Sequence, residues 1–184
     1  AIVLNEALQK IDYGGTVHID PVNGQAGQTY PIGTSANPSN NLFDAHEIAE
    51  NNNLYSFEVH GNLAIDMDLT EGYHFTGASG GGLLTLTGFN VSQATFENFY
   101  ITGDLGGQLI RLEKCRVGNV TNFVGAMWDC IMLNDFKFAS GSENLMRNCY
   151  SATFSEVNND TTTPRIIMGD LLDGESVVVS MRGW

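Results

Sequence analysis

One pattern recurs in the stretch from Leu84 to Phe154: Phe96-Glu97-Asn98-Phe99, Leu112-Glu113-Lys114-Cys115, Met127-Trp128-Asp129-Cys130 and Met146-Arg147-Asn148-Cys149. Each copy has an apolar residue, two mostly polar residues, and then Phe or Cys. The last position recurs at residues 99, 115, 130 and 149, in steps of 16, 15 and 19 residues. This spacing is typical of one coil of a parallel β-solenoid, because helical repeats need ~33 residues or more and sandwich strands follow one another every ~8 to 12 residues. The repeat therefore predicts an all-β protein, a single-stranded right-handed parallel β-helix.

The three cysteines all fall at the same repeat position, at Cys115, Cys130 and Cys149. Equivalent positions of a solenoid stack ~4.8 Å apart, and inward cysteines behave as small hydrophobic residues. We therefore expect a buried column of thiols, and the odd number excludes a complete disulfide framework. A metal site is the alternative reading, but no close Cys/His pair with ligand spacing supports it.

Composition limits the classes of function. The chain has 184 residues, enough for one domain with a sizeable core, and 42% of them are hydrophobic. Only 16% are charged, where ~25% is typical. The net charge of −13 argues against binding to nucleic acid, whose phosphates require Lys and Arg. No run of ~18 apolar residues occurs, so the sequence predicts no membrane insertion.

The residues before the repeat predict a lead-in and a cap. Residues 1–15 hold a short helical pattern, which we interpret as a lead-in or the end of a stalk. Residues 16–56 form the predicted cap region, in which a strand at 16–20 and a loop at 21–41 precede a helix at 41–50. One face of that helix is apolar, with Leu42, Ala45, Ile48 and Ala49. We expect the helix to lie as a lid over the first coil, which otherwise exposes its apolar interior and an open strand edge.

Residues 57–184 form the predicted β-helix. Phe57 and Val59 begin an alternation of apolar and polar residues that continues into the clear repeat. Further short apolar runs at 166–168, 171–172 and 177–179 predict additional strands. The chain stops directly after the last of these, and a solenoid needs both ends covered. We therefore expect a β-helix truncated at its C-terminal end, or one whose end a partner covers.

Several segments resemble those of a known family. They are Asp20-Pro21-Val22-Asn23-Gly24, Tyr30-Pro31-Ile32-Gly33-Thr34, Asn40-Asn41-Leu42 and the pairs Asp129-Cys130 and Asn148-Cys149. Together they resemble bacteriophage and prophage virion proteins in which such a segment precedes a right-handed β-helix, and the resemblance covers roughly residues 16 to 184. It implies a homotrimeric part of a tail fibre, spike or appendage that contacts other virion proteins. The implied location is the extracellular virion, after synthesis in the cytoplasm of the bacterial host. The family supplies no catalytic residues.

Carboxylates and histidines are the first candidates for chemistry. Asp66 and Asp68 are predicted to point outward from one strand, and Glu97 and Glu113 occupy equivalent repeat positions. Either pair could act as acid and base on a polysaccharide, although a solvated acidic face is the more ordinary reading. The four histidines, His18, His46, His60 and His74, are far apart in the sequence. We interpret each as a surface or turn residue, and predict no catalytic residue, no metal site and no cofactor.

Aromatic residues are the second candidates. Tyr100, Trp128 and Tyr150 lie beside inward repeat positions, so alternation can turn them outward. Outward aromatic rings on a solenoid can stack on sugars or contact a protein partner. We predict that these three residues contact a host-surface glycan or a partner. The other aromatic residues of the repeat are predicted to lie in the core: Phe96, Phe99, Phe123, Phe136 and Phe138.

The sequence thus predicts a structural and adhesive component of a tailed-phage virion, without enzymatic activity, that presents a rigid β-helical rod for host attachment. The first alternative is a polysaccharide depolymerase or lyase on the same fold. The second is a capsid decoration or tail structural protein that binds no receptor.

Overall fold

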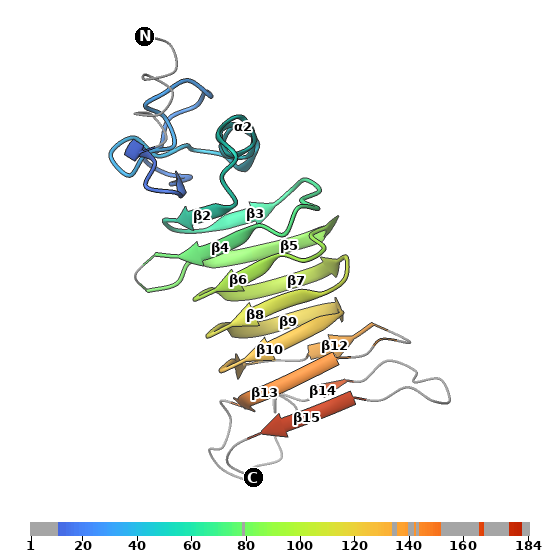
Figure 1. Cartoon of the computed structure of the whole chain (residues 1–184). Helices are drawn as coiled ribbons and strands as arrows, with labels where there is room; N and C mark the ends of the chain where they lie inside the picture. The colour runs from blue at the N-terminus through green and yellow to red at the C-terminus, as the bar shows by residue number, and fades with distance from the viewer. Residues whose placement is uncertain are drawn as a thin grey trace.

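The computed structural model describes residues 11–78, 80–133, 136–139, 142 and 144–149 in full, and the backbone alone of residues 150–151, 166–167 and 177–181. The chain winds into a parallel β-solenoid of about five turns, and one short helix precedes it (Figure 1). The predicted parallel β-helix with an N-terminal capping helix is thereby confirmed. No helix within the described residues has the length and apolar character that a membrane crossing requires.

Two rows of parallel strands make up the wall of the solenoid. The first row is β1 (Val17–Ile19), β2 (Ser56–Val59), β4 (His74–Gly77), β6 (Thr95–Glu97), β8 (Ile110–Glu113), β10 (Gly125–Trp128), β13 (Asn144–Ser151) and β15 (Val177–Met181). The second row is β3 (Leu63–Ile65), β5 (Leu83–Asn90), β7 (Tyr100–Gly106) and β9 (Arg116–Phe123), followed by β11 (Ile131–Met132), β12 (Phe136–Phe138) and β14 (Ile166–Ile167). Strand β13 joins the rows, because it pairs with β10 and then with β11.

The strand register places one inward side chain of each turn directly against its counterpart in the next. This inward column consists of Val17, Phe57, Phe75, Phe96, Leu112, Met127 and Met146, all fully buried. One turn therefore takes between 15 and 21 residues, counted from residue 57 to residue 146 of this column. The ring centroids of Phe57 and Phe75 are 4.7 Å apart, and those of Phe75 and Phe96 are 5.4 Å apart, both in stacked geometry.

The corner between the two rows repeats in the later turns. Its first residue adopts a left-handed backbone conformation, with φ of 62° at Asn98, 52° at Lys114, 54° at Asp129 and 54° at Asn148. The next residue points inward and is buried: Phe99, Cys115, Cys130 and Cys149. The thiols of the last three approach main-chain oxygens of the preceding turn at 3.3, 3.5 and 3.6 Å. The predicted buried column of free thiols is thus confirmed.

Helix α2 (Leu42–Asn52) closes the interior of the first turn (Figure 1). Asn41 caps its first turn by accepting a hydrogen bond from the main-chain N–H of Asp44 at 2.7 Å, and Asn53 ends it in the left-handed conformation. The predicted apolar face is buried, and it belongs to the same core as the solenoid. The helix packs against β1 and β3. Its predicted role as a lid over the apolar interior is therefore confirmed.

The open edge of β1 is covered in a different way from the one predicted. The residue range 33–39 of the cap loop runs along β1 and hydrogen-bonds to it. His18 N–H donates to the Gly33 oxygen at 2.8 Å, Ser39 N–H donates to the His18 oxygen at 2.9 Å, and Asp20 N–H donates to the Ser39 oxygen at 2.8 Å. The loop therefore satisfies the strand edge while the helix covers the core, and the expectation that the helix alone does both is corrected.

Other predictions have mixed outcomes. The five Phe residues assigned to the core are buried. Asp66 and Asp68 are exposed as expected, but β3 ends at Ile65, so both lie in the loop after the strand. Most of the predicted N-terminal helical segment and the predicted strand at 171–172 lie outside the described residues, whereas β14 and β15 coincide with two of the predicted strands.

The aromatic part of the inward column can be tested by truncation. We expect Phe75→Ala to lower the free energy of unfolding by about 3–5 kcal/mol, because it leaves a cavity between two stacked rings. Phe89→Ala removes a ring that is 42% exposed, and we expect it to cost less than about 1 kcal/mol. Urea denaturation of the two variants measures both values. Equal losses would contradict the inward placement of Phe75.

Candidate functional site

The three aromatic residues predicted to contact a glycan lie on two different rows. Tyr100 on β7 and Tyr150 on β13 belong to one column of the second row, because Tyr100 pairs with Arg116, Arg116 with Ile131, and Ile131 with Tyr150. Trp128 lies on β10 of the first row. Tyr100 and Trp128 therefore lie on different rows of the solenoid, and only the backbone of Tyr150 is described.

Trp128 is half-buried and is embedded among charged side chains. The guanidinium carbon of Arg111 lies 4.8 Å from the centroid of the indole ring, a cation–π geometry. The register places Glu113 on one side of Trp128 and Arg147 on the other. The Arg111 guanidinium covers one face of the indole, so a sugar ring can stack only on the other face, with Glu113 and Arg147 as charged neighbours in the adjoining turns.

Tyr100 is partly used in packing. It is half-buried, and its hydroxyl lies directly over Gly118 in the next turn. Any side chain at residue 118 would collide with it, because even a Cβ there would be 2.7 Å from the Tyr100 hydroxyl. The Tyr100 side chain therefore extends across the next turn, above the space that Gly118 leaves open. Less of this ring is available to a ligand than its place beside an inward position suggests.

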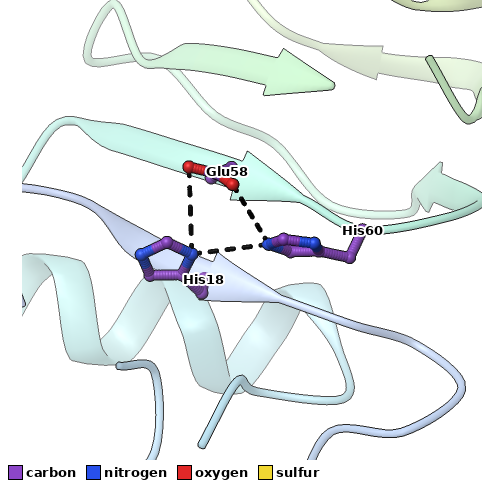
Figure 2. A group of neighbouring side chains, drawn as sticks. All are labelled: His18, Glu58 and His60. Carbon is purple, nitrogen blue, oxygen red and sulfur yellow. Dashed lines mark hydrogen bonds and ion pairs between the residues drawn. The ribbon is translucent and has the colours of Figure 1, made fainter. Parts of the chain in front are cut away.

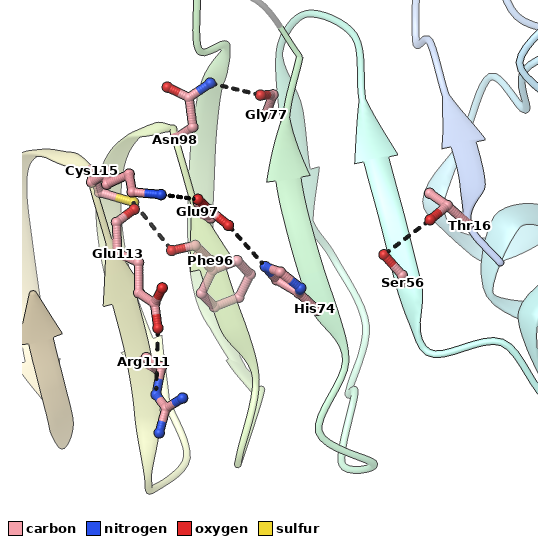
Figure 3. Close-up of polar contacts among 11 residues, drawn as sticks. Thr16, Ser56, His74, Gly77, Phe96, Glu97, Asn98, Arg111, Glu113 and Cys115 are labelled. Carbon is pink, nitrogen blue, oxygen red and sulfur yellow. Dashed lines mark hydrogen bonds and ion pairs between the residues drawn. The ribbon is translucent and has the colours of Figure 1, made fainter. Parts of the chain in front are cut away.

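The two stacked glutamates of the repeat are paired with basic side chains. Glu97 and Glu113 are register partners on β6 and β8. Glu97 lies 2.6 Å from the Lys114 ammonium and 3.4 Å from His74 Nε2, and Glu113 lies 3.7 Å from Arg111 (Figure 3). The Lys114 hydrogen bond, opposed in part by burial, lowers the pKa of Glu97. A carboxylate held in its ionised form is poorly suited to act as the general acid of a glycosidase.

The structure brings together three side chains that the sequence separates. His18 projects from β1, Glu58 from β2, and His60 follows β2 directly (Figure 2). His18 Nδ1 lies 3.5 Å from His60 Nε2 and 4.0 Å from a Glu58 carboxylate oxygen, and His60 Nε2 lies 3.2 Å from the other oxygen. His18 and His60 are 42 residues apart in the sequence, yet they are neighbours in the structure. We call these three residues the shoulder cluster, because they lie where the cap meets the first turn.

The shoulder cluster lies at the surface, with one member more enclosed than the others. The side chain of His18 is 14% exposed, and those of Glu58 and His60 are 40% and 41% exposed. Burial lowers the pKa of His18, Glu58 raises it by a smaller amount, and the neighbouring His60 lowers it again. Burial therefore favours a neutral His18 imidazole, which keeps a lone pair on one ring nitrogen.

An open hollow of about 310 Å³ borders His60. Its other lining residues are Gly61, Ala78, Gly80, Gly81 and Gly82, so backbone atoms form most of its wall. The hollow and the shoulder cluster share His60, whereas His18 and Glu58 do not line the hollow. Within the described residues, the shoulder cluster is the one group of three or more His, Cys, Asp or Glu side chains whose donor atoms all lie within 4.8 Å of one another.

Local sequence patterns place His18 and Glu58 on the outer face of their strands, but they do not show that the two residues meet. Val17-His18-Ile19 and Phe57-Glu58-Val59 each carry one polar residue between two apolar ones, and Val17 pairs with Phe57 in the structure. Once that register is known, His18 and Glu58 must be neighbours on the outer face. The sequence alone does not give the register, because the two strands are separated by the whole cap.

Comparisons of the chain with models of protein families, with curated proteins and with solved structures found no match. The resemblance to phage virion proteins therefore stays a prediction.

The ion pairs of Glu97 lead to a test by titration. We expect Lys114→Met to raise the pKa of Glu97 more than His74→Gln does, because the lysine is the larger cause of its lowered value. Carbon-13 NMR of the Glu97 carboxyl across the acid range measures the pKa in each variant. A larger effect of His74→Gln would contradict the assigned geometry.

The same pair predicts the direction of a pH effect on stability. In the unfolded chain a Glu has a pKa of ~4.3, and in the folded protein the pKa of Glu97 is lower. The stability that ionised Glu97 gives to the folded protein is therefore fully present above pH ~4.3. It is lost as the pH falls through the lowered folded pKa. Urea denaturation of the wild type and of Lys114→Met at several acidic pH values measures this loss, and the difference between the two proteins should shrink as the pH falls.

Proposed function

We propose that the chain is a structural and adhesive component of a tailed-phage virion, part of a tail fibre, spike or surface appendage. The unbroken inward column from Val17 to Met146 is the observation that carries this proposal. A solenoid with a continuous core is stiff, since each turn is hydrogen-bonded to the turns on both sides. Such a rod suits a protein that must hold a binding surface away from a particle. The resemblance of the cap segments to virion proteins supports the same assignment.

The cap prevents the N-terminal strand edge of the solenoid from pairing with other chains. Open strand edges favour pairing with other chains. Here the loop 33–39 satisfies the edge of β1, and α2 buries the apolar interior behind it. The edge of β1 is therefore protected against edge-to-edge aggregation, and we expect other molecules to bind along the flanks of the solenoid.

We further propose that three copies associate side by side. Large apolar side chains on the flank support this: Phe89 near the end of β5 is 42% exposed, and Leu109 just before β8 is 72% exposed. A symmetric trimer would cover such residues with the same residues of its neighbours. Analytical ultracentrifugation, with small-angle scattering for the shape, tests the assembly; a compact monomeric particle would contradict the trimeric rod.

The receptor is proposed to be a host-surface glycan, and Trp128 is the preferred contact. We expect Trp128→Ala to weaken binding of labelled protein to purified lipopolysaccharide or capsule by about 10-fold or more, since buried aromatic anchors dominate such contacts. Trp128→Phe retains a ring and should retain more of the binding. Phe43→Ala, on the exposed face of α2, is the matched control and should bind as the wild type does.

The products of glycan cleavage distinguish the enzymatic alternative from the adhesive proposal. The same glycans are incubated with the protein and examined for new reducing or unsaturated ends. Release of oligosaccharides would replace the adhesive proposal with a depolymerase or lyase. Absence of glycan and cell binding, in a protein with the expected rod shape, would instead favour a structural virion part without a receptor.

A further inference from the structure

We propose that the shoulder cluster of His18, Glu58 and His60 is a binding site for a divalent transition-metal ion of the Zn²⁺ type, which fastens the cap to the first turn of the solenoid. Figure 2 shows the two imidazole rings and the carboxylate turned toward a common point. The donor set contains two nitrogens and one carboxylate oxygen, supplied by three side chains of this chain.

The spacing of the donor atoms fits such an ion. A tetrahedral Zn²⁺ with bonds of about 2.0–2.1 Å holds its donor atoms about 3.3–3.4 Å apart. The nitrogen pair is separated by 3.5 Å, and the two nitrogens lie 3.2 and 4.0 Å from different oxygens of the Glu58 carboxylate. With one donor atom taken from each side chain, all three lie within 4.8 Å of one another, and a rotation of the partly exposed Glu58 carboxylate can bring one oxygen closer to both nitrogens. The cluster therefore needs little rearrangement to enclose an ion.

The chemistry of the donors selects the class of ion. Imidazole nitrogens favour Zn²⁺, Cu²⁺, Ni²⁺ and Fe²⁺, whereas Ca²⁺ and Mg²⁺ favour sites made of oxygen atoms. Three protein ligands leave at least one coordination position for water or for an exogenous group. A water or a small anionic ligand can take that position, and His60 also borders the hollow of about 310 Å³.

The charge of this half of the chain independently favours a cation. No Lys or Arg occurs between Lys10 and Arg111, although this span contains eleven Asp and Glu residues. The ion pairs of Glu58 are both with histidines, and its register neighbour in the next turn is the uncharged Thr76. No fixed positive charge of this span therefore competes for the site, and its excess of carboxylates attracts cations.

The position of the ligands gives the ion a structural role. His18 comes from β1 in the cap, whereas Glu58 and His60 belong to the first complete turn, and His18 and His60 are 42 residues apart. An ion bound to both segments closes the loop that contains α2. A cross-link that closes a long loop removes much conformational freedom from the unfolded chain, so the ion should stabilise the junction between cap and rod.

The test uses the full chain without a histidine tag, stripped of metal by a chelator. Isothermal titration with Zn²⁺ should give one saturable site per chain, and Zn²⁺ should raise the Tm. Glu58→Gln and His60→Gln should each weaken binding by more than about 100-fold, because even losing a residue behind a ligand costs about 10- to 100-fold. His74→Gln is the matched control, since this histidine also faces a glutamate on the outer surface, and it should bind as the wild type does.

Two measurements keep the result interpretable. Circular dichroism of the metal-free variants checks that each substitution leaves the fold intact, and His60→Gln, at an exposed corner, carries the test if Glu58→Gln does not fold. Co²⁺ in place of Zn²⁺ should give the intense visible absorption of a four-coordinate site in the wild type and lose it in His60→Gln. Failure of the wild type to bind Zn²⁺ saturably would overturn the proposal, as would equal binding by His60→Gln and the wild type.

Discussion

Each turn of the solenoid must place one inward side chain directly against the equivalent side chain of the turn before. A strand that slips by one residue would turn all of its apolar side chains outward. The column from Val17 to Met146 therefore sets the register of the remaining residues in each strand. The thiol column, the left-handed corners and the outward rows of charged residues all follow from that register. The shoulder cluster depends on it as well, since the pairing of Val17 with Phe57 is what brings His18 beside Glu58.

The fold was largely predictable because its later turns carry a visible period. Phe99, Cys115, Cys130 and Cys149 recur at the inward position after each corner, so the coil length can be read directly. The earlier turns lack the cysteine, and only their alternation of apolar and polar residues reveals them. The capping helix was predictable from Asn41 and its apolar face. The pairing of the loop 33–39 with β1 was not, because it consists of main-chain hydrogen bonds that leave no side-chain pattern.

The candidate site was far less predictable, for a physical reason. His18 and His60 become neighbours only when two strands on either side of the cap pair in register, and no local spacing encodes that contact. Outward residues such as Trp128 were predictable as outward, because alternation assigns the face of a strand. Their surroundings were not, since Arg111 reaches the Trp128 ring from the preceding turn and Arg147 is its register neighbour in the following one. Residues far apart in sequence thus decide the chemistry of the outer face, while local patterns decide the core.

The repeated corner has a consequence for how this rod can vary. From Asn98 onward, each described passage from the first row to the second takes two residues, a left-handed one and a buried one. The returns from the second row to the first differ in length, from residues 66–73 after β3 to the single residue 124 after β9. From Asn98 onward, one side of the solenoid is therefore a corner of constant length, whereas the other side varies in length. New loops can be added on the variable side without disturbing the stack, and that is where such a scaffold can diversify its surface.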